Sequence, residues 1–136
     1  MVVSALLASK GKIAGDEVLI SFCRLATSHL RPNDLFGRIG GEEFASLLPD
    51  IGRHDALSLA ERVRKAFEAS FHTTGQCAFS STVSVGVAIS DERSDLNGLL
   101  SAADQALYRA KALGRNRVEP SPHSAERSTT QRAIAV

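Results

Sequence analysis

The spacing of apolar residues in the first third of the chain predicts one helix followed by two strands. After Gly15, apolar residues recur every three or four positions, which is the pattern of an amphipathic helix. We expect this helix to end before Pro32, because proline disfavours helical geometry in the residue that precedes it. Apolar runs at 35–39 and 44–48 predict two short strands, and the glycine pair between them predicts a hairpin.

A second helix is predicted at residues 54–70. Its apolar residues fall on one face, and three charged residues are expected in solvent on the other. The apolar face consists of Leu57, Ala60, Val63 and Phe67, and the charged face of Glu61, Arg62 and Arg64.

The clearest strand is predicted at residues 82–90, where bulky and small side chains alternate. The bulky face carries Val83, Val85, Val87 and Ile89, and the small face carries Ser84, Gly86 and Ala88. The small face leaves room for a closely packed helix or for a ligand. A third helix follows at 96–113, with a core face of Leu100, Ala103, Leu107 and Ala110, and Gly114 is suited to cap its C-terminus.

The composition changes at residue 119, after which Pro, Ser and Thr dominate and the apolar periodicity is lost. Residues 119–136 are therefore predicted to be a flexible tail, and residues 1–118 to be one domain. Helices and strands are mixed and their connections are short. This arrangement predicts an α+β fold with a mainly antiparallel central sheet flanked by helices.

Composition and charge narrow the class of protein. The chain has 136 residues, 43% of them apolar, which is enough for one domain with a core. A net charge of +1, one Tyr and no Trp argue against a nucleic-acid-binding protein. No apolar stretch reaches the length of a membrane span, and the first residues lack the basic segment of a signal peptide. We therefore expect a cytoplasmic protein.

The predicted hairpin carries the chemistry that stands out most. Gly40 and Gly41 run directly into Glu42 and Glu43, so a flexible turn is followed by two carboxylates. Magnesium favours a few carboxylates together with phosphate oxygens, which makes this turn a candidate metal–phosphate site. An equally good interpretation at this point is a hairpin tip with two solvated glutamates.

Cations near the end of the third predicted helix are candidate phosphate ligands. Lys111 and Arg115 lie four residues apart around Gly114, and together they offer a point charge and a planar fork. The alternative is that both cations simply interact favourably with the C-terminal end of the helix dipole. Taken alone, this pair favours the alternative.

Two further acidic positions are candidates for guanine recognition. In Arg31-Pro32-Asn33-Asp34, the arginine can reach base acceptors and the aspartate can accept from base N–H groups. Asp16 is a second carboxylate of this kind. The ordinary interpretations are a surface pair that ends a helix and a helix N-cap.

Five motifs occur in a fixed order along the chain. They are Gly15-Asp16-Glu17-Val18-Leu19, Arg31-x-x-Asp34, Arg38-x-Gly-Gly-Glu-Glu-Phe44, Val83-Ser84-Val85-Gly86-Val87-Ala88 and Ala103-Asp104-x-Ala106-Leu107-Tyr108-x-Ala110-Lys111-x-x-Gly114-Arg115-Asn116. In this order and spacing they resemble a GGDEF domain, the catalytic domain of diguanylate cyclases, over residues 11–118.

The resemblance implies a function, a cofactor and a set of site residues. Two GTP molecules would be condensed to cyclic di-GMP by two domains that face each other as a homodimer. The implied roles are magnesium binding by Glu42 and Glu43, proton removal from the ribose 3′-hydroxyl by Glu42, close approach of the nucleotide at Gly40 and Gly41, guanine recognition by Asp16, phosphate binding by Lys111 and Arg115, and an inhibitory product site at Arg31 and Asp34.

The start of the chain departs from the family pattern. A first strand with Asp-x-Asp-x-Phe-Lys and a following Asn is expected there, but the Asn position is Leu7 and residues 1–6 contain no acid. We therefore expect an N-terminally truncated domain without its first strand, its first metal-binding Asp or an upstream regulatory domain. Alternatively, Met1 to Leu6 replace part of that strand, since Val2, Val3, Leu6 and Leu7 are apolar. Impaired catalysis is the expected consequence, and an inactive module that binds cyclic di-GMP through Arg31 and Asp34 is the alternative function.

Overall fold

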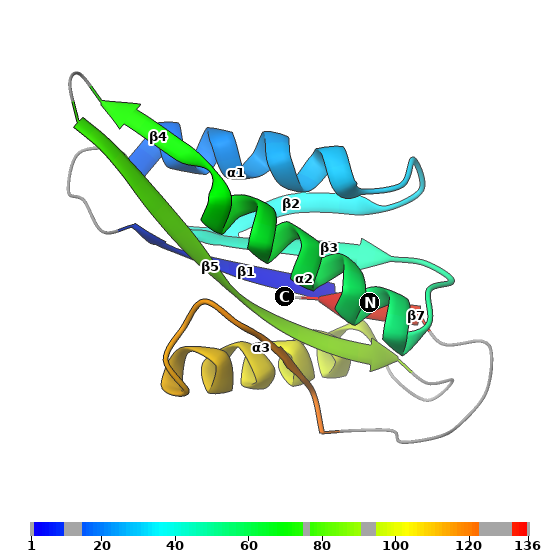
Figure 1. The fold of residues 1–136 in the computed structure, drawn as a ribbon. Coiled ribbons are helices and arrows are strands. Elements are labelled where there is room, and N and C mark those ends of the chain that lie inside the picture. Colours follow the sequence, from blue (N-terminus) through cyan, green and yellow to red (C-terminus); the bar gives the residue numbers. More distant parts are fainter. Residues whose placement is uncertain (1, 10–14, 75–76, 91–94, 123–131, 136) are drawn as a thin grey trace.

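The computed structural model describes residues 2–9, 15–74, 77–90, 95–122 and 132–135. The predicted helices and strands occur in the predicted order, together with further strands, and Figure 1 shows their arrangement. They are β1 (Val2–Ser9), α1 (Gly15–His29), β2 (Leu35–Gly40), β3 (Glu43–Leu48), α2 (Arg53–Ala69), β4 (Phe71–Thr74), β5 (Cys77–Ser90), α3 (Leu96–Ala112), β6 (Val118–Pro120) and β7 (Arg132–Ala135).

The sheet lies between two layers of helices, with α1 and α2 on one face and α3 on the other (Figure 1). On the first face, the buried rings of Phe22, Phe44 and Phe67 form a cluster in the core, and the rings of Phe22 and Phe67 lie 5.2 Å apart. On the second face, Gly86 of β5 meets α3 so closely that an added Cβ would lie 2.3 Å from the carbonyl oxygen of Ala103. The small face predicted for this strand is therefore occupied by a closely packed helix.

The strands pair mainly in antiparallel fashion, as the sequence predicts. β2 and β3 form a hairpin, β4 pairs with the first part of β5, and β1 pairs with both β3 and β5. The one parallel pair among the described strands joins β5 to β6. The chain thus has the expected α+β fold with a central sheet flanked by helices.

The expectation that the first strand is missing is corrected by β1. Val2–Ser9 is a strand between β3 and β5, with Leu6 in register with Glu43 and Ala5 in register with Phe44. An apolar segment can fill this position because a strand that is paired along both of its edges needs apolar residues rather than a particular motif. The segment supplies the strand but no acidic residue.

Two described strands, β6 and β7, lie wholly or mostly in the segment for which composition predicts a flexible tail. β6 lies beside β5, and the backbone N–H of Ser121 donates to the carbonyl of Val87 at 2.6 Å. β7 pairs with both β3 and β5. Pairing with strands far away in sequence, rather than local propensity, determines these elements.

The helices bury wider faces than the simple periodicity predicts. In α2 the buried residues are Ala56, Leu59, Ala60, Val63 and Phe67, while Leu57 is only partly buried. In α3, Leu99 and Ala106 are buried and Leu100 is only partly buried. None of the helices in the described ranges is long and apolar enough to span a membrane.

Candidate functional site

The β2–β3 hairpin presents the two glutamates at one end of the sheet. Gly41 has φ +49°, in the left-handed region where glycine is favoured, and the guanidinium of Arg38 donates to its carbonyl at 2.8 Å. Glu42 is exposed at the tip and Glu43 is half-buried as the first residue of β3. The predicted hairpin is confirmed, and both carboxylates remain accessible to a ligand.

The C-terminal end of α3 brings a cation to the hairpin. Lys111 Nζ lies 3.9 Å from Glu43 Oε1, although the two residues are 68 positions apart in the chain. At this distance the ion pair is weak, so the ammonium keeps most of its capacity to bind an anion. One predicted phosphate ligand and one predicted metal ligand are therefore neighbours in space.

Arg115 follows the cap that ends α3. Gly114 has φ +117°, and the N–H groups of Gly114 and Arg115 donate back to the carbonyls of Lys111 and Ala110, at 3.4 and 2.9 Å. This is the glycine cap that the sequence predicts. The Arg115 side chain is exposed, and within the described ranges it makes no hydrogen bond or ion pair.

Asp16 lies on the first turn of α1 and is exposed. An acidic residue in this turn interacts favourably with the helix dipole, which is the ordinary interpretation of this position. In the described part of the chain, no hydrogen bond or ion pair joins the Asp16 side chain to the hairpin. The structure therefore brings Lys111 to Glu43 without placing Asp16 against either of them.

The hairpin alone does not complete a metal site. Across the described ranges, no third His, Cys, Asp or Glu joins Glu42 and Glu43 in a group that could hold a metal ion. The neighbouring strand β1 contains no acid, and its residue in register with Glu43 is Leu6. Two carboxylates hold magnesium only together with water and phosphate oxygens, so metal binding here would depend on the nucleotide.

Arg31 and Asp34 form a tight pair between α1 and β2. The guanidinium donates to the carboxylate at 2.8 Å, and the backbone N–H of Arg31 donates to the other carboxylate oxygen, also at 2.8 Å. The hydrogen bond to Asp34 raises the pKa of Arg31 above its usual value. The Asp34 side chain is wholly buried while 47% of the Arg31 side chain is exposed, so a ligand would reach the arginine first.

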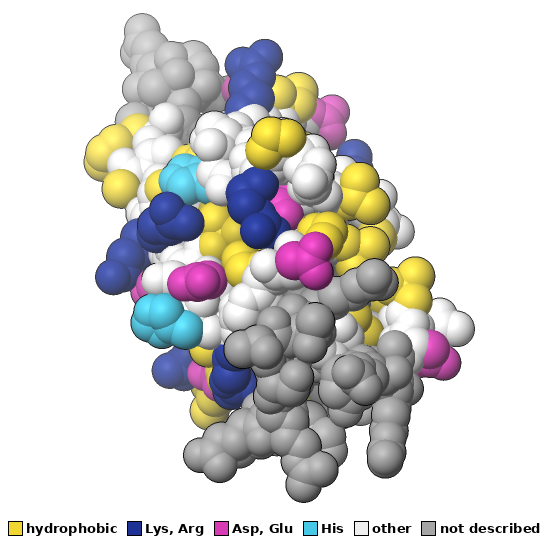
Figure 2. Space-filling view, turned by 90° about the vertical axis from the view of Figure 1, so that its right-hand side faces the viewer, with side chains coloured by type: hydrophobic (Ala, Val, Ile, Leu, Met, Phe, Trp, Pro, Cys, Tyr) yellow, Lys and Arg dark blue, Asp and Glu magenta, His cyan; other side chains and the backbone are white. Residues whose placement is uncertain are grey.

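A polar groove of about 510 Å³ opens beside Arg31. Its lining comes from the end of α1, the β3–α2 connection and α2, and combines the charged Asp50, Asp55 and Arg62 with His29 and with uncharged residues such as Leu59. Figure 2 shows the side of the molecule that lies on the right in Figure 1, where basic, acidic and histidine side chains gather. This face could accept a ligand that carries both hydrogen-bond donors and negative charge.

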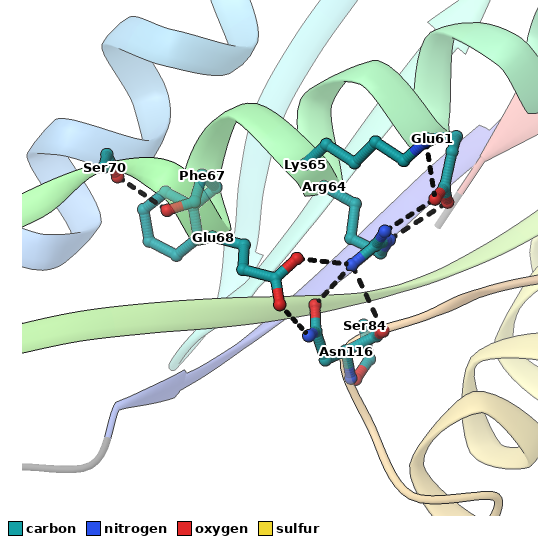
Figure 3. A network of polar contacts seen from close by, with 8 residues as sticks. All are labelled: Glu61, Arg64, Lys65, Phe67, Glu68, Ser70, Ser84 and Asn116. Atoms are coloured by element: carbon teal, nitrogen blue, oxygen red, sulfur yellow. Dashed lines mark hydrogen bonds and ion pairs between the residues drawn. The ribbon is translucent and has the colours of Figure 1, made fainter.

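A polar junction that sequence reasoning missed joins α2 to the loop after α3 (Figure 3). Arg64 was predicted to lie in solvent, but only 12% of its side chain is exposed. Its guanidinium donates to Glu61 at 2.6 Å, to Glu68 at 3.0 Å and to the side-chain oxygen of Asn116 at 2.8 Å. The spacing of Glu61, Arg64 and Glu68 along the helix signals the local ion pairs, but nothing local signals Asn116.

The comparisons with known proteins identify the family. Residues 6–117 match the family described as "Diguanylate cyclase, GGDEF domain". The chain is 45% identical over 108 residues to diguanylate cyclase DgcM of Escherichia coli and 41% identical over 111 residues to response regulator PleD of Caulobacter vibrioides. The match covers 79% of this chain in both cases but only 26% and 24% of those proteins, so the chain spans about a quarter of their length.

Solved structures agree with this assignment. The active GGEEF domain of a diguanylate cyclase from Vibrio cholerae is similar with a TM-score of 0.79 and 30% identity, over 90% of this chain and 83% of that one. The GGDEF domain of DgcB from Caulobacter crescentus, in complex with c-di-GMP, is similar with a TM-score of 0.80 and 25% identity, over 90% and 78% of the two chains. Sequence family and fold therefore lead to one conclusion: the chain belongs to the GGDEF family of diguanylate cyclase domains.

Proposed function

We propose that this chain binds GTP between the β2–β3 hairpin and the C-terminal end of α3. The observation that supports the proposal most directly is the 3.9 Å approach of Lys111 Nζ to Glu43 Oε1. A cation and a carboxylate beside a glycine turn suit a triphosphate that carries a divalent metal ion. In this proposal, Lys111 and Arg115 hold the phosphates, Gly40 and Gly41 allow the nucleotide to approach, and Asp16 contacts guanine.

The proposed reaction is the condensation of two GTP molecules to cyclic di-GMP, in the cytoplasm. Glu42 would accept the proton of the ribose 3′-hydroxyl, whose oxygen bonds to the α-phosphorus of the other GTP as the bond to pyrophosphate breaks. Magnesium, held with the help of Glu42 and Glu43, would supply positive charge to the phosphates. Each ring closure needs two nucleotides, so two copies of the domain would face each other as a homodimer.

We further propose that turnover by this chain is impaired. The carboxylates at the hairpin number two, and the register partner of Glu43 on β1 is a leucine. A missing carboxylate removes negative charge that would help to hold the cation. Weak magnesium binding should then limit the rate even where GTP binds.

Measurement of cyclic di-GMP formed from GTP and magnesium tests this function. We expect slow formation by the natural sequence and faster formation by Leu6→Asp, which adds a carboxylate in register with Glu43. Leu7→Asp is the matched control, since neighbouring strand residues point to opposite faces. Rapid turnover by the natural sequence would contradict the impairment, and absence of GTP binding in calorimetry would contradict the proposed site.

A second candidate function is the binding of cyclic di-GMP at Arg31. It is supported by the half-exposed guanidinium at the rim of the charged groove. Arginine can donate in a planar fork to guanine acceptors or to a phosphate, and the buried Asp34 holds it in place.

Calorimetry with cyclic di-GMP distinguishes this candidate from the first. Binding that is lost in Arg31→Ala and kept in Arg24→Ala, an exposed arginine of α1, would support it. If Arg31→Ala binds cyclic di-GMP as tightly as the natural sequence does, the ligand does not use this groove.

A further inference from the structure

The loop that carries Arg115 has an unusual backbone. Among the described residues other than glycine, three have positive φ, and two of them are the consecutive Arg115 (φ +63°) and Asn116 (φ +46°). Asparagine tolerates the left-handed region through its short polar side chain, but arginine pays a steric penalty there. A strained conformation of this kind persists only where the surroundings determine it, and such residues cluster at ligand sites.

Asn116 is held at every polar group it has. Its side-chain oxygen accepts from Arg64 at 2.8 Å, and its side-chain nitrogen donates to Glu68 at 2.8 Å. Its backbone N–H donates to the hydroxyl of Ser84 at 3.2 Å, and its carbonyl accepts a longer contact from Arg64 at 3.4 Å. Figure 3 shows these contacts arriving from α2 on one side and from β5 on the other.

The partners of Asn116 are themselves fixed. Arg64 is anchored by Glu61 and Glu68 on its own helix, three residues before it and four residues after it. The hydrogen bond from Asn116, followed by that from Arg64, lowers the pKa of Glu68, so the carboxylate is ionised at neutral pH. The Arg64 guanidinium and the Glu68 carboxylate of α2 are therefore already in place to bind the side-chain amide of Asn116.

The backbone around Arg115 is anchored, whereas the Arg115 side chain is exposed. The N–H of Arg115 closes the cap of α3 on the carbonyl of Ala110, and Asn116 directly after it is tied to α2 and β5. The Arg115 side chain, in contrast, is exposed and makes no polar contact in the described ranges. The backbone on both sides of Arg115 is thus fixed, while its guanidinium remains available.

We propose that Asn116, clamped by Arg64 and Glu68 of α2, is a positioning residue that aims Arg115 at the phosphates of the bound nucleotide. The inference rests on the proposed role of Arg115 in binding GTP and deepens it. It makes α2, which packs on the face of the sheet opposite α3, part of the support of the phosphate site. Asn116 touches no nucleotide in this proposal and acts only through Arg115.

Calorimetric binding of GTP and of guanosine, which lacks phosphates, tests the proposal. We expect Asn116→Ala and Arg64→Ala to weaken GTP binding roughly tenfold, the size of one charge-assisted hydrogen bond, and to leave guanosine binding unchanged. Asn116→Gly should behave like Asn116→Ala, because glycine allows the left-handed backbone but lacks the clamped amide. Lys65→Ala, which removes an exposed cation from the same helix, is the matched control.

A double variant separates a positioning role from a general structural one. In the Arg115→Ala background, Asn116→Ala should cause no further loss of GTP affinity, because the residue through which it acts is gone. Equal and additive losses would overturn the proposal, as would a parallel loss of guanosine binding. Thermal melting of each sample verifies that binding is measured on folded protein.

Failure of the proposed function would give a different pattern. If Arg115→Ala weakens GTP binding but Asn116→Ala and Arg64→Ala do not, the phosphate site stands and the positioning role is wrong. If the natural sequence binds GTP no more tightly than guanosine, Arg115 binds no phosphate, and both proposals are wrong.

Discussion

Two regions of this molecule contain similar charged residues and use them in opposite ways. At the junction of α2 with the loop after α3, Arg64, Glu61 and Asn116 meet at distances between 2.6 and 2.8 Å. At the hairpin, Glu43 meets Lys111 only at 3.9 Å. Charges that are paired within the chain hold the backbone in place, and charges that lack close partners remain available to a ligand.

The same contrast extends to the glycines of the sheet. Gly86 lies against the backbone of α3 at a distance that excludes a side chain, whereas Gly37 in the hairpin has no atom within 4 Å of an added Cβ. The backbone is thus closely packed around Gly86 and open around Gly37. We therefore expect substitutions at Gly86 and at the junction to reduce stability more than substitutions at Gly37 and at Glu43.

The largest effect is expected from Gly86→Ala. The new methyl group would overlap the carbonyl oxygen of Ala103 and the amide nitrogen of Leu107, both 2.3 Å away, and these are backbone atoms that cannot turn aside. We expect a loss of about 3 kcal/mol in the free energy of unfolding, at the upper end of the usual cost of overpacking. Gly37→Ala is the matched control and should change it by less than about 0.5 kcal/mol in urea denaturation. Similar stability of the two variants would contradict the difference in packing between Gly86 and Gly37.

A smaller loss of stability is expected from Arg64→Ala. It leaves Glu61, Glu68 and the side-chain oxygen of Asn116 without a shared donor. We expect a loss of about 2 kcal/mol in the free energy of unfolding, because hydrogen bonds to charged groups contribute more than those between neutral groups. The change should appear as a lower urea midpoint with an unchanged slope. Lys65→Ala, whose contact with Glu61 is 3.9 Å, should cost less than about 0.5 kcal/mol.

At the hairpin, the expected pattern is reversed. Glu43→Gln should change the free energy of unfolding by less than about 0.5 kcal/mol, since its partner is distant and partly solvated. The same variant should weaken magnesium-dependent binding of GTP, because an amide oxygen carries no charge for the cation. A large loss of stability without loss of nucleotide binding would mean that Glu43, like the charges of the junction, holds the fold in place rather than a ligand.

The smallest effect concerns pH. Hydrogen bonds from Arg64 to Glu61 and from Asn116 to Glu68 are the first causes that lower the pKa of each carboxyl below its usual 4.5. Groups with a lowered pKa stabilise the fold above the unfolded value and lose that contribution as pH falls through the folded value. The urea midpoint should therefore decrease below pH 4.5, and less steeply in Arg64→Ala than in Lys65→Ala. Equal slopes in both variants would contradict the role of this network.

Much of the fold follows from local pattern. The ranges of α1, α2 and α3 agree with the predicted helices within one or two residues, because periodic apolar faces, Pro32 and Gly114 are local signals. The hairpin follows from its glycine pair for the same reason. The strands β4, β6 and β7 were not predicted, since their short sequences become strands by pairing with β3 or β5.

For the candidate site, too, one part follows from the sequence and the other only from the tertiary structure. The residue types at the hairpin and at the end of α3 were evident from the sequence, and their common order indicated the family that the comparisons confirm. Their distances were not evident: nothing local shows that Lys111 reaches Glu43 or that Asp34 is buried under Arg31. Arg64 was assigned to solvent because a helical pattern records only which face is polar, not what packs against it.

The sequence by itself determined the helices, the turns and the family of this protein, because these depend on neighbouring residues and on motifs in a fixed order. The tertiary structure decided which charges are paired and which are open. Arg64 and Asn116 lie 52 positions apart and meet at 2.8 Å, while Arg115 beside them stays exposed. That distinction arises from packing of whole elements, whose long-range contacts leave no periodic trace in the chain.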